Sequence, residues 1–437
     1  MRPLLVLAVW GMFLLQPPSL LISQPTLSKE DILLQARQEI DTLCSDYLAG
    51  RGYIGEGHQK AATYLSHRFK EIGLMPKGDF GRYQQSFNIQ INLPAKVTAS
   101  LGSTELEAGK NLIVNRFSGS GSINAKVVNL GYGLKVKPTV RGKIAMFRDG
   151  FPPKIANDSK KKDRYKDLSR PLQRIQAILA YKPAAIIVVK EKLTMGFSRE
   201  AGSIPIIEVL ASDLPTKVKH ATIKVESGMQ RIKTQNVLGL IKGSKVPDSV
   251  LVISAHYDHL GMLSEAIFPG ANDNASGTTM LLSMAEYFSK DTHQPPYSLL
   301  FIAFGGEETG LLGSQYYVTR DPKISLSRMK FLLNLDLMGN GVDGIMAVGG
   351  KDFPAFFDQL VEANEELSAV PRVRSRKNAP NSDHFFFLKN GVPGFFIYTE
   401  GGPKHYHDIY DNPTTIELSR YVEVRGLLIQ FLENLMK

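Results

Sequence analysis

Five short segments in the second half of the chain contain side chains that can bind metal ions or move protons. Their acidic and histidine residues are His256 and Asp258, Asp273, Glu307 and Glu308, Asp336, and His405, His407 and Asp408. Because Cys44 is the only cysteine, any metal site must be built from imidazoles and carboxylates, without a thiolate. This donor set suits zinc or another divalent first-row metal. It is also large enough for two ions that share a bridging carboxylate.

Most of these residues directly follow segments that the sequence predicts to be buried strands. The segments are dense in Val, Ile, Leu and Phe, as in strands covered on both faces, and they are residues 250–254, 299–304, 331–335 and 394–398. Helices are expected at residues 277–289, 311–319, 354–367 and 417–436. This alternation predicts a layered α/β sheet. Since ligand sites in open α/β sheets lie beyond the carboxyl ends of strands, the polar side chains are expected to converge.

Taken together, these motifs resemble those of the co-catalytic zinc exopeptidases. That family includes bacterial secreted aminopeptidases, glutamate carboxypeptidases and the catalytically silent transferrin receptors. The matching stretches are SAHYDHLG (254–261), GANDNASG (270–277), FGGEETG (304–310), NLDLMG (334–339), and Tyr406-His407 with Asp411. Upstream, LAGRG (48–52) and the helix expected at 58–72 also look like the family's N-terminal signature.

The resemblance implies a metal ligand set for this chain. Asp273 would bridge two zinc ions per chain. His256 and Asp336 would complete the protein ligands of one ion, and Glu308 and His407 those of the other.

The resemblance also implies roles for three residues that do not bind the metals. Glu307 would be the general base, Asp258 would orient His256 by accepting its second N–H, and Tyr406 would help to hold the tetrahedral intermediate. The family further has a cis peptide after the bridging aspartate, here between Asp273 and Asn274. Asp383 and His384 match a family stretch near the substrate, where they either act directly or support a loop. His259 is expected to be structural.

The middle of the chain has a different composition. Short apolar stretches typical of β-strands occur at 125–130, 143–147, 185–189 and 204–209, and a Lys-rich segment lies at 154–166. It resembles a protease-associated (PA) domain through RGKIAMF (141–147), KPAAIIVV (182–189) and IPII (204–207). The implied fold class is α/β: a three-layer α/β/α zinc-exopeptidase domain with a central mixed sheet, interrupted by a β-rich PA-like domain. The expected divisions are residues 24–94 and 234–437 for the peptidase domain and 95–233 for the insertion.

The N-terminus predicts export of the protein. Arg2 precedes an apolar run, residues 4–15, which Gln16-Pro17-Pro18 interrupts before the small residue Ser23. This is typical of a signal peptide, here residues 1–23, and a retained anchor is the alternative. The mature chain is therefore expected to be secreted or periplasmic, without stable membrane insertion.

The chain has 437 residues and a formal net charge of +10, from 52 Lys and Arg against 42 Asp and Glu. Such a charge first suggests nucleic acid or an anionic surface as a partner. However, much of it clusters at residues 154–166 and 372–377, and several acids are assigned to the metal site. The charge is therefore interpreted as a basic exterior on an enzyme whose partners are peptide or protein substrates, with no nucleic acid and an oligomeric state left open.

The function predicted from this set is that of a secreted zinc-dependent aminopeptidase. The alternative is a carboxypeptidase of the glutamate carboxypeptidase type, which needs a cation for the substrate carboxylate. Arg372, Arg374, Arg376 and Lys377 are candidates for that cation. A glutaminyl cyclase, expected to hold a single zinc, and a noncatalytic receptor-like protein are further alternatives, and the intact Glu307 argues against the last.

Overall fold

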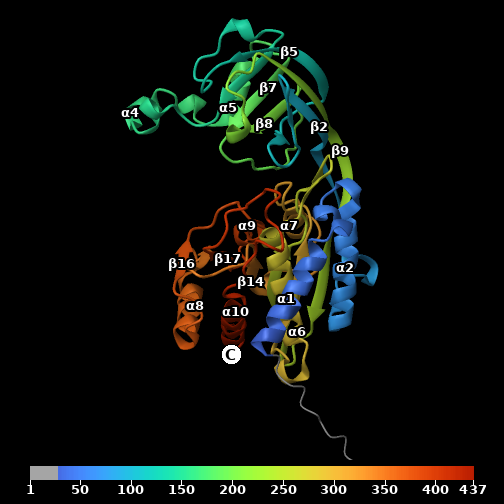
Figure 1. Ribbon diagram of the computed structural model, residues 1–437. Coiled ribbons are helices and arrows are strands. Elements are labelled where there is room, and N and C mark those ends of the chain that lie inside the picture. Colours follow the sequence, from blue (N-terminus) through green and yellow to red (C-terminus); the bar gives the residue numbers. More distant parts are fainter. Residues whose placement is uncertain (1–27) are drawn as a thin grey trace, which may run out of the picture.

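The computed structural model describes residues 28–437, so the signal peptide predicted for residues 1–23 lies outside the described residues. Figure 1 shows two bodies, one above the other, joined on one side by two long strands. The lower body contains the segments expected to form the peptidase domain, and the upper body contains the insertion. Within residues 28–437, no helix has both the length and the apolar character needed to span a bilayer.

The lower body is built on a mixed sheet. Its strands run in the order β16 (Val373–Arg376), β15 (Gly344–Val348), β17 (Gly394–Glu400), β14 (Met329–Leu335), β10 (Val246–His256), β13 (Tyr297–Phe304) and β9 (His220–Ile241). β17, β14, β10 and β13 are parallel, whereas β15 and β9 are antiparallel to their neighbours β17 and β13. The short β1 (Met75–Pro76) also pairs with β9. The carboxyl ends of the four parallel strands therefore share one edge.

Helices cover both faces of this sheet, which confirms the predicted three-layer α/β/α class. One face carries α1 (Lys29–Leu43), α2 (Gly57–Ile72), α6 (Gly277–Phe288), α8 (Pro354–Leu367) and α10 (Tyr421–Leu435). The other face carries α7 (Leu312–Thr319) and α9 (His384–Lys389). Side chains alternate between the two cores along a strand: Leu251 and Ile253 of β10 face the first core, Val250 and Val252 the second.

The helix termini follow from local sequence. Ser28 caps α1: its Oγ accepts the Asp31 N–H at 3.1 Å, and the Asp31 carboxylate accepts the Ser28 N–H at 3.2 Å. α2 ends at Gly73, whose φ of 89° lies in the left-handed region that glycine adopts without strain. The end of α2 at Ile72 matches the helix expected at residues 58–72.

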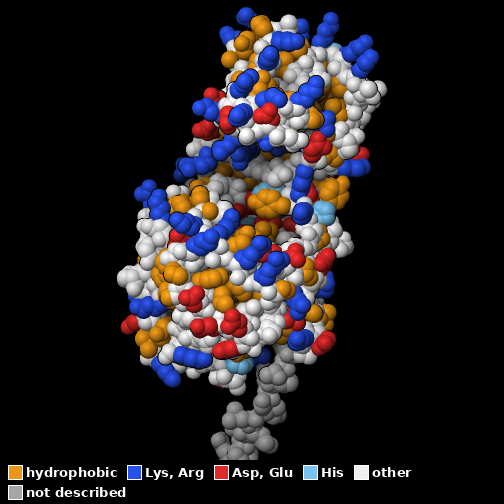
Figure 2. Space-filling view, turned by 90° about the vertical axis from the view of Figure 1, so that its left-hand side faces the viewer, with side chains coloured by type: hydrophobic (Ala, Val, Ile, Leu, Met, Phe, Trp, Pro, Cys, Tyr) orange, Lys and Arg blue, Asp and Glu red, His pale blue; other side chains and the backbone are white. Residues whose placement is uncertain are grey.

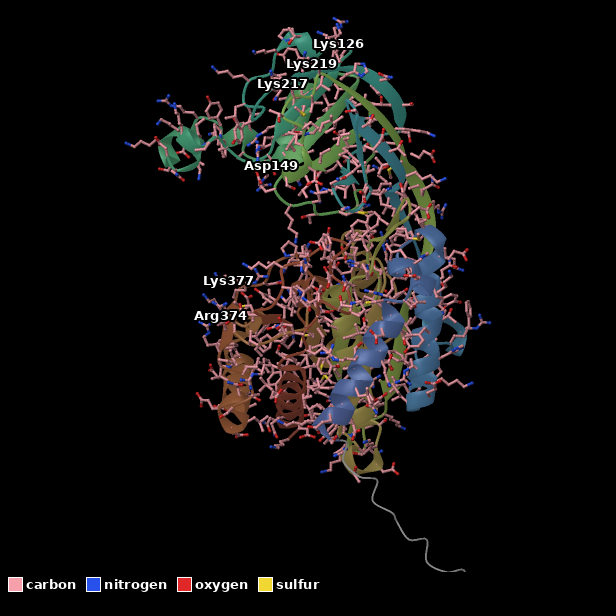
Figure 3. All side chains as sticks on the ribbon, in the orientation of Figure 1. Lys126, Asp149, Lys217, Lys219, Arg374 and Lys377 are labelled. Carbon is pink, nitrogen blue, oxygen red and sulfur yellow. The ribbon has the colours of Figure 1, made fainter. Side chains whose placement is uncertain are left out.

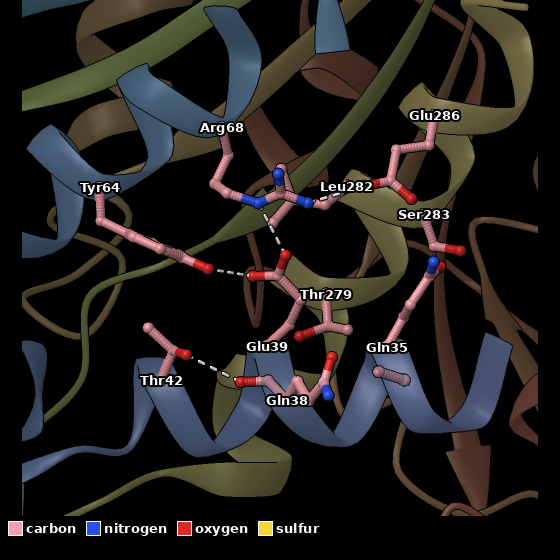
Figure 4. Close-up of a pocket in the computed structure, with 11 residues that line it drawn as sticks. Gln35, Gln38, Glu39, Thr42, Tyr64, Arg68, Thr279, Leu282, Ser283 and Glu286 are labelled. Carbon is pink, nitrogen blue, oxygen red and sulfur yellow. Dashed lines mark hydrogen bonds and ion pairs between the residues drawn. The ribbon is translucent and has the colours of Figure 1, made fainter. Parts of the chain in front are cut away.

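A half-buried arginine ties three helices of the first face together. Figure 4 shows Arg68 of α2 reaching Glu39 of α1 and Glu286 of α6, each with an N–O distance of 2.7 Å. Tyr64 donates to the other oxygen of Glu39. The pocket between α1, α2 and α6 is thus lined by an ion-pair network that links α6, the helix that follows the GANDNASG loop, to α1 and α2.

The upper body contains the β-rich insertion. β2 (Gln84–Leu101) and β9 pair antiparallel along most of their length, and the chain between them adds β3 (Thr104–Leu106), β4 (Leu112–Val114), β5 (Gly121–Asn129), β6 (Ile144–Arg148), β7 (Ala185–Lys190) and β8 (Ile206–Leu210). The Lys-rich segment forms α3 (Pro153–Ala156) and α4 (Ser159–Asp163), followed by α5 (Pro171–Leu179). We call residues 102–219 the inserted domain.

The predicted boundaries, 94/95 and 233/234, fall inside β2 and β9, so both strands run continuously from one body to the other. The two bodies are therefore connected by two hydrogen-bonded strands, and not by a flexible linker; we call this connection the join. A small hairpin of β11 (Gly261–Leu263) and β12 (Ala266–Phe268) lies near this join, where β11 contacts β2.

Candidate metal centre and active site

The polar residues named from the sequence come together at the carboxyl edge of the parallel strands. His256 is the last residue of β10, and Asp336 directly follows β14. Glu307 and Glu308 follow β13 after two glycines, and Asp273 lies in the turn that opens α6. His407 comes from the loop after β17. The expected convergence is therefore present, because the parallel strands end at one edge.

Asp273 has one carboxylate oxygen directed at each of two ligand groups. Its Oδ1 lies 3.3 Å from Nε2 of His256, which is also 3.3 Å from Oδ1 of Asp336. Its Oδ2 lies 3.1 Å from Nε2 of His407, which is also 3.1 Å from Oε2 of Glu308. This is the arrangement of a bridging carboxylate between two three-residue groups.

The tautomers of the two histidines leave a lone pair on each Nε2. Nδ1 of His256 lies 3.1 Å from the backbone carbonyl of Asp258, and Nδ1 of His407 lies 2.9 Å from that of Met195. Because a carbonyl only accepts, each Nδ1 carries the proton. Each unprotonated Nε2 then faces carboxylate oxygens, so that two hydrogen-bond acceptors lie next to each other. This contact is favourable only when a proton or a metal ion lies between the two atoms.

The role expected for the Asp258 carboxylate differs in the structure. Its oxygen is 4.0 Å from Nδ1 of His256, and the Asp258 backbone carbonyl orients the ring instead. The carboxylate accepts hydrogen bonds from Tyr53 Oη at 3.2 Å and from the Glu307 N–H at 3.1 Å. Asp258 thus positions the backbone of Glu307, because its side chain is turned toward the turn after β13.

The backbone of the bridging residue is held by a second aspartate. The carboxylate of Asp411 accepts the N–H of Asn272 at 2.8 Å and the N–H of Asp273 at 2.9 Å. The peptide between Asp273 and Asn274 is cis, as the family resemblance predicts.

Two further side chains orient the carboxylate ligands. Ser382 donates from Oγ to Oδ2 of Asp336 at 2.9 Å and accepts from Asn334 at 2.8 Å. Nδ1 of His259 lies 2.7 Å from Oε1 of Glu308. The sequence interpretation had no role for Ser382, although it lies in the stretch that also contains Asp383, and it assigned His259 only a structural one.

The LAGRG stretch contacts the backbone of two segments that carry site residues. The buried Arg51 donates to the carbonyls of Tyr257, Pro269 and Gly270, each at 2.7 Å, and to that of Leu43 at 2.9 Å. It therefore connects the segment after β10 with the loop that carries Asp273. Gly52 packs on Gly261 so closely that an added Cβ would lie 2.3 Å from the Gly261 Cα.

The electrostatics of the site favour bound cations. Burial, with the carboxylates of Glu308, Asp383 and Asp336, raises the pKa of Glu307 well above its usual range. Burial alone would lower the pKa of His256, but Asp336 and Glu307 raise it. Oδ1 of Asp336 is buried and has no hydrogen-bond partner among the described residues. Excess negative charge, an orphaned oxygen and imidazole lone pairs all fit two divalent metal ions.

A cavity of about 250 Å³ opens beside these ligands. It is lined by His256, Asp273, Glu307, Asp336, Leu337, Arg376, Asn381, Phe396, Tyr398 and Tyr406. The half-exposed ring of Tyr406 stacks on His407 with centroids 3.8 Å apart, and Tyr406 also lines the cavity.

The other named residues lie as follows. Asp383 and His384 are fully buried, and none of their side-chain polar atoms has a hydrogen-bond partner within the described part of the chain. Burial raises the pKa of Asp383 to about 7. Of the four candidate cations, Arg376 alone lines the cavity, whereas Arg374 pairs with Glu400 on the surface. Figure 3 shows Arg374 and Lys377 at the outer side of the lower body.

The family model described as peptidase family M28 matches residues 236–432. Among curated proteins, Aminopeptidase YwaD of Bacillus subtilis is 30% identical over 265 residues, which are 57% of this chain and 52% of that protein. A probable leucine aminopeptidase 2 of Aspergillus oryzae is 25% identical over 401 residues, 84% of this chain and 73% of that protein. The chain spans about half the length of YwaD, and 22% and 26% of the next two relatives, which are probable fungal zinc metalloproteases.

Among solved structures, that of BSAP, a zinc aminopeptidase from Bacillus subtilis, aligns with a TM-score of 0.69 at 22% identity. The alignment covers 92% of this chain and 95% of that one, which shows a shared fold. The peptidase M28 precursor from Shewanella amazonensis aligns with a TM-score of 0.65 at 16% identity.

The α/β/α sheet carries an acidic, histidine-containing centre at its carboxyl edge, which is the arrangement that the motifs predict. Residues 236–432, which carry that centre, belong to peptidase family M28. The family resemblance inferred from the motifs is thereby confirmed for these residues.

Proposed function

We propose that the protein is a zinc-dependent aminopeptidase that removes N-terminal residues from peptides with two zinc ions per chain. The observation that carries the proposal is the position of Asp273, whose two oxygens face two separate ligand groups at 3.1 to 3.3 Å. The names of the relatives, an aminopeptidase and zinc metalloproteases, support the same activity and the same metal.

In this proposal His256 and Asp336 hold one ion, Glu308 and His407 the other, and Asp273 both. When bound, the two cations supply Lewis-acid polarisation of the scissile carbonyl and lower the pKa of water in the site. The protein's own residues orient the substrate and move the proton.

Glu307 is the general base. Ligand atoms of Glu307, His256 and Glu308 lie within 4.8 Å of one another, so its carboxylate can reach a water held in the ligand set. It takes the proton of the attacking water and passes it to the leaving amine as the peptide bond breaks. Asp258 fixes the start of this residue through the Glu307 N–H. Tyr406 Oη donates a hydrogen bond to the tetrahedral intermediate.

Two parts of the proposal concern the rest of the chain. The protein is exported by an N-terminal signal, residues 1–23, and acts outside the cytoplasm. The inserted domain, with the outer parts of β2 and β9, is PA-like and covers the cleft above the metal site. Its β-rich core and its contact with His407 support this arrangement.

The test is Glu307→Gln in the mature protein, assayed on peptides with a free N-terminus. Zinc content is expected to stay as in the wild type while kcat falls by about two to four orders of magnitude, the usual contribution of a general base. Chelator is expected to remove activity from the wild type, and added zinc to restore it. Near-normal turnover by the zinc-loaded variant would refute the role of Glu307.

A further inference from the structure

The cavity beside the metal ligands contains a positive charge that the proposed chemistry does not use. Arg376, the last residue of β16, lines the cavity together with Phe396 and Tyr398 of β17. Its backbone is fixed at the sheet edge, because the Gly349 N–H donates to the Arg376 carbonyl at 3.0 Å. Its side chain therefore extends across β15 toward β17 and the site.

The guanidinium is oriented, yet no carboxylate neutralises it. Its Cζ lies 5.6 Å from the ring centroid of Tyr398. With its amide oxygen turned to the guanidinium, Asn381 accepts from Nη2 at 2.8 Å. Among residues 28–437, no acidic side chain forms an ion pair with Arg376, and its Nε is buried without a hydrogen-bond partner. Elsewhere in the same strand Arg374 is paired with Glu400, which leaves Arg376 as the arginine of β16 without an ion pair.

A planar guanidinium with free N–H groups is built for bidentate binding of a carboxylate. We propose that Arg376 makes this cavity a specificity pocket for a substrate carboxylate, supplied by the side chain of an N-terminal Glu or Asp. The inference rests on the proposed aminopeptidase function and names its substrate class. The cavity, at about 250 Å³, is smaller than the roughly 300–1,000 Å³ of sites for larger ligands, and it suits a single side chain.

The surroundings of the cleft fit an acidic peptide. Figure 2 shows Lys and Arg side chains on both rims of the hollow between the two bodies. The larger cavity between the bodies is lined by Arg116 and Arg170 and reaches Glu308 and His407. Its Lys190 is paired with Glu208 at 2.9 Å, and Asp149 also lines it. Positive charge on both sides of a cleft raises the local concentration of anionic substrates.

The test compares C-terminally amidated tripeptides that differ only in the first residue, Glu, Gln or Leu, with the zinc-loaded mature protein. Gln matches Glu in shape without the charge. We expect kcat/KM for Glu to exceed that for Gln by about 10- to 100-fold, the effect of a charge-assisted hydrogen bond. Arg376→Met is expected to abolish this ratio. Arg374→Met, on the same strand but outside the cavity, is expected to keep it.

A second arm separates the two sources of a carboxylate. N-acetylated peptides with a free C-terminus lack the amino group that an aminopeptidase needs. If they are cleaved in an Arg376-dependent manner, the guanidinium binds the C-terminal carboxylate, which overturns both the inference and the aminopeptidase proposal. If the amidated peptides are cleaved with no preference for Glu over Gln, or with a preference that Arg376→Met retains, the inference alone fails. No cleavage of any amidated peptide refutes the proposed function, and with it the inference.

Discussion

The backbone carbonyl of Met195 in the inserted domain lies 2.9 Å from Nδ1 of His407, and the Met195 N–H donates to the His407 carbonyl at 3.1 Å. This two-way contact holds His407 at φ 59°, an uncommon backbone conformation for a residue other than glycine. A proposed ligand of the second metal ion is therefore oriented by the inserted domain.

Removal of the inserted domain should weaken one ion. Leu101 of β2 pairs with Ala221 of β9, so residues 102–220 can be replaced by a two-residue Asn-Gly turn that joins these two residues. Loss of the Met195 carbonyl frees the imidazole, and we expect zinc affinity at the His407 group to fall by about 10- to 100-fold, as for other outer-shell partners. Isothermal titration calorimetry measures both sites, with His407→Ala as the comparison. Two sites of wild-type affinity in the shortened chain would contradict the prediction.

If Asp273 bridges the two ions, its substitution should change the number of zinc ions bound per chain. Asp273→Ala removes a ligand from both groups, so purified protein is expected to lose most of both ions. Asp336→Ala removes a ligand from the His256 group alone, and the other ion is expected to remain. Metal content by mass spectrometry of the folded proteins distinguishes these results, with the exposed Glu365→Ala on α8 as the control. If both variants lose the same single ion, Asp273 is not a bridge.

Arg51 is expected to be important for stability. Arg51→Met leaves the carbonyls of Leu43, Tyr257, Pro269 and Gly270 buried without their donor. Unfolding free energy should fall by about 3–5 kcal/mol, as when one partner of a buried charged contact is removed. The exposed Arg82→Met should change it by less than about 0.5 kcal/mol. Urea unfolding followed by circular dichroism measures both, and similar values for the two variants would be evidence against the role of Arg51.

Cys44 should be unreactive in the folded protein. Burial raises the pKa of its thiol to about 11. A pKa about two units above that of a normal thiol corresponds to about 100-fold less thiolate at pH 8. Alkylation of the folded protein should therefore be at least about 100-fold slower than alkylation of the protein unfolded in urea. Since the folded thiol stays protonated while the unfolded one ionises between about pH 9 and 11, this group's contribution to stability is lost as pH rises through that window. Equal alkylation rates with and without urea would contradict the prediction.

Much of the fold follows from local patterns in the sequence. The strands at 250–254, 299–304, 331–335 and 394–398 are present as β10, β13, β14 and β17, since continuous apolar runs bounded by turns leave few alternatives. β15, β16 and α9 were not predicted, because they are short and Val373–Arg376 alternates with charged residues. The join through β2 and β9 was also missed, because the boundaries were placed at a change of composition that falls inside both strands.

The sequence by itself determined which residue types gather after each strand, and with them a centre of carboxylates and imidazoles without a thiolate. Only the tertiary structure decided which atoms face one another. It turned the Asp258 carboxylate toward Glu307, aimed the two oxygens of Asp273 at two separate groups, and brought Met195 to His407 across 212 residues of chain. It also selected Arg376 from four nearby cations. The physical reason is that these contacts depend on strand order and loop packing. The local spacing of the residues in the sequence determines neither the strand order nor the loop packing.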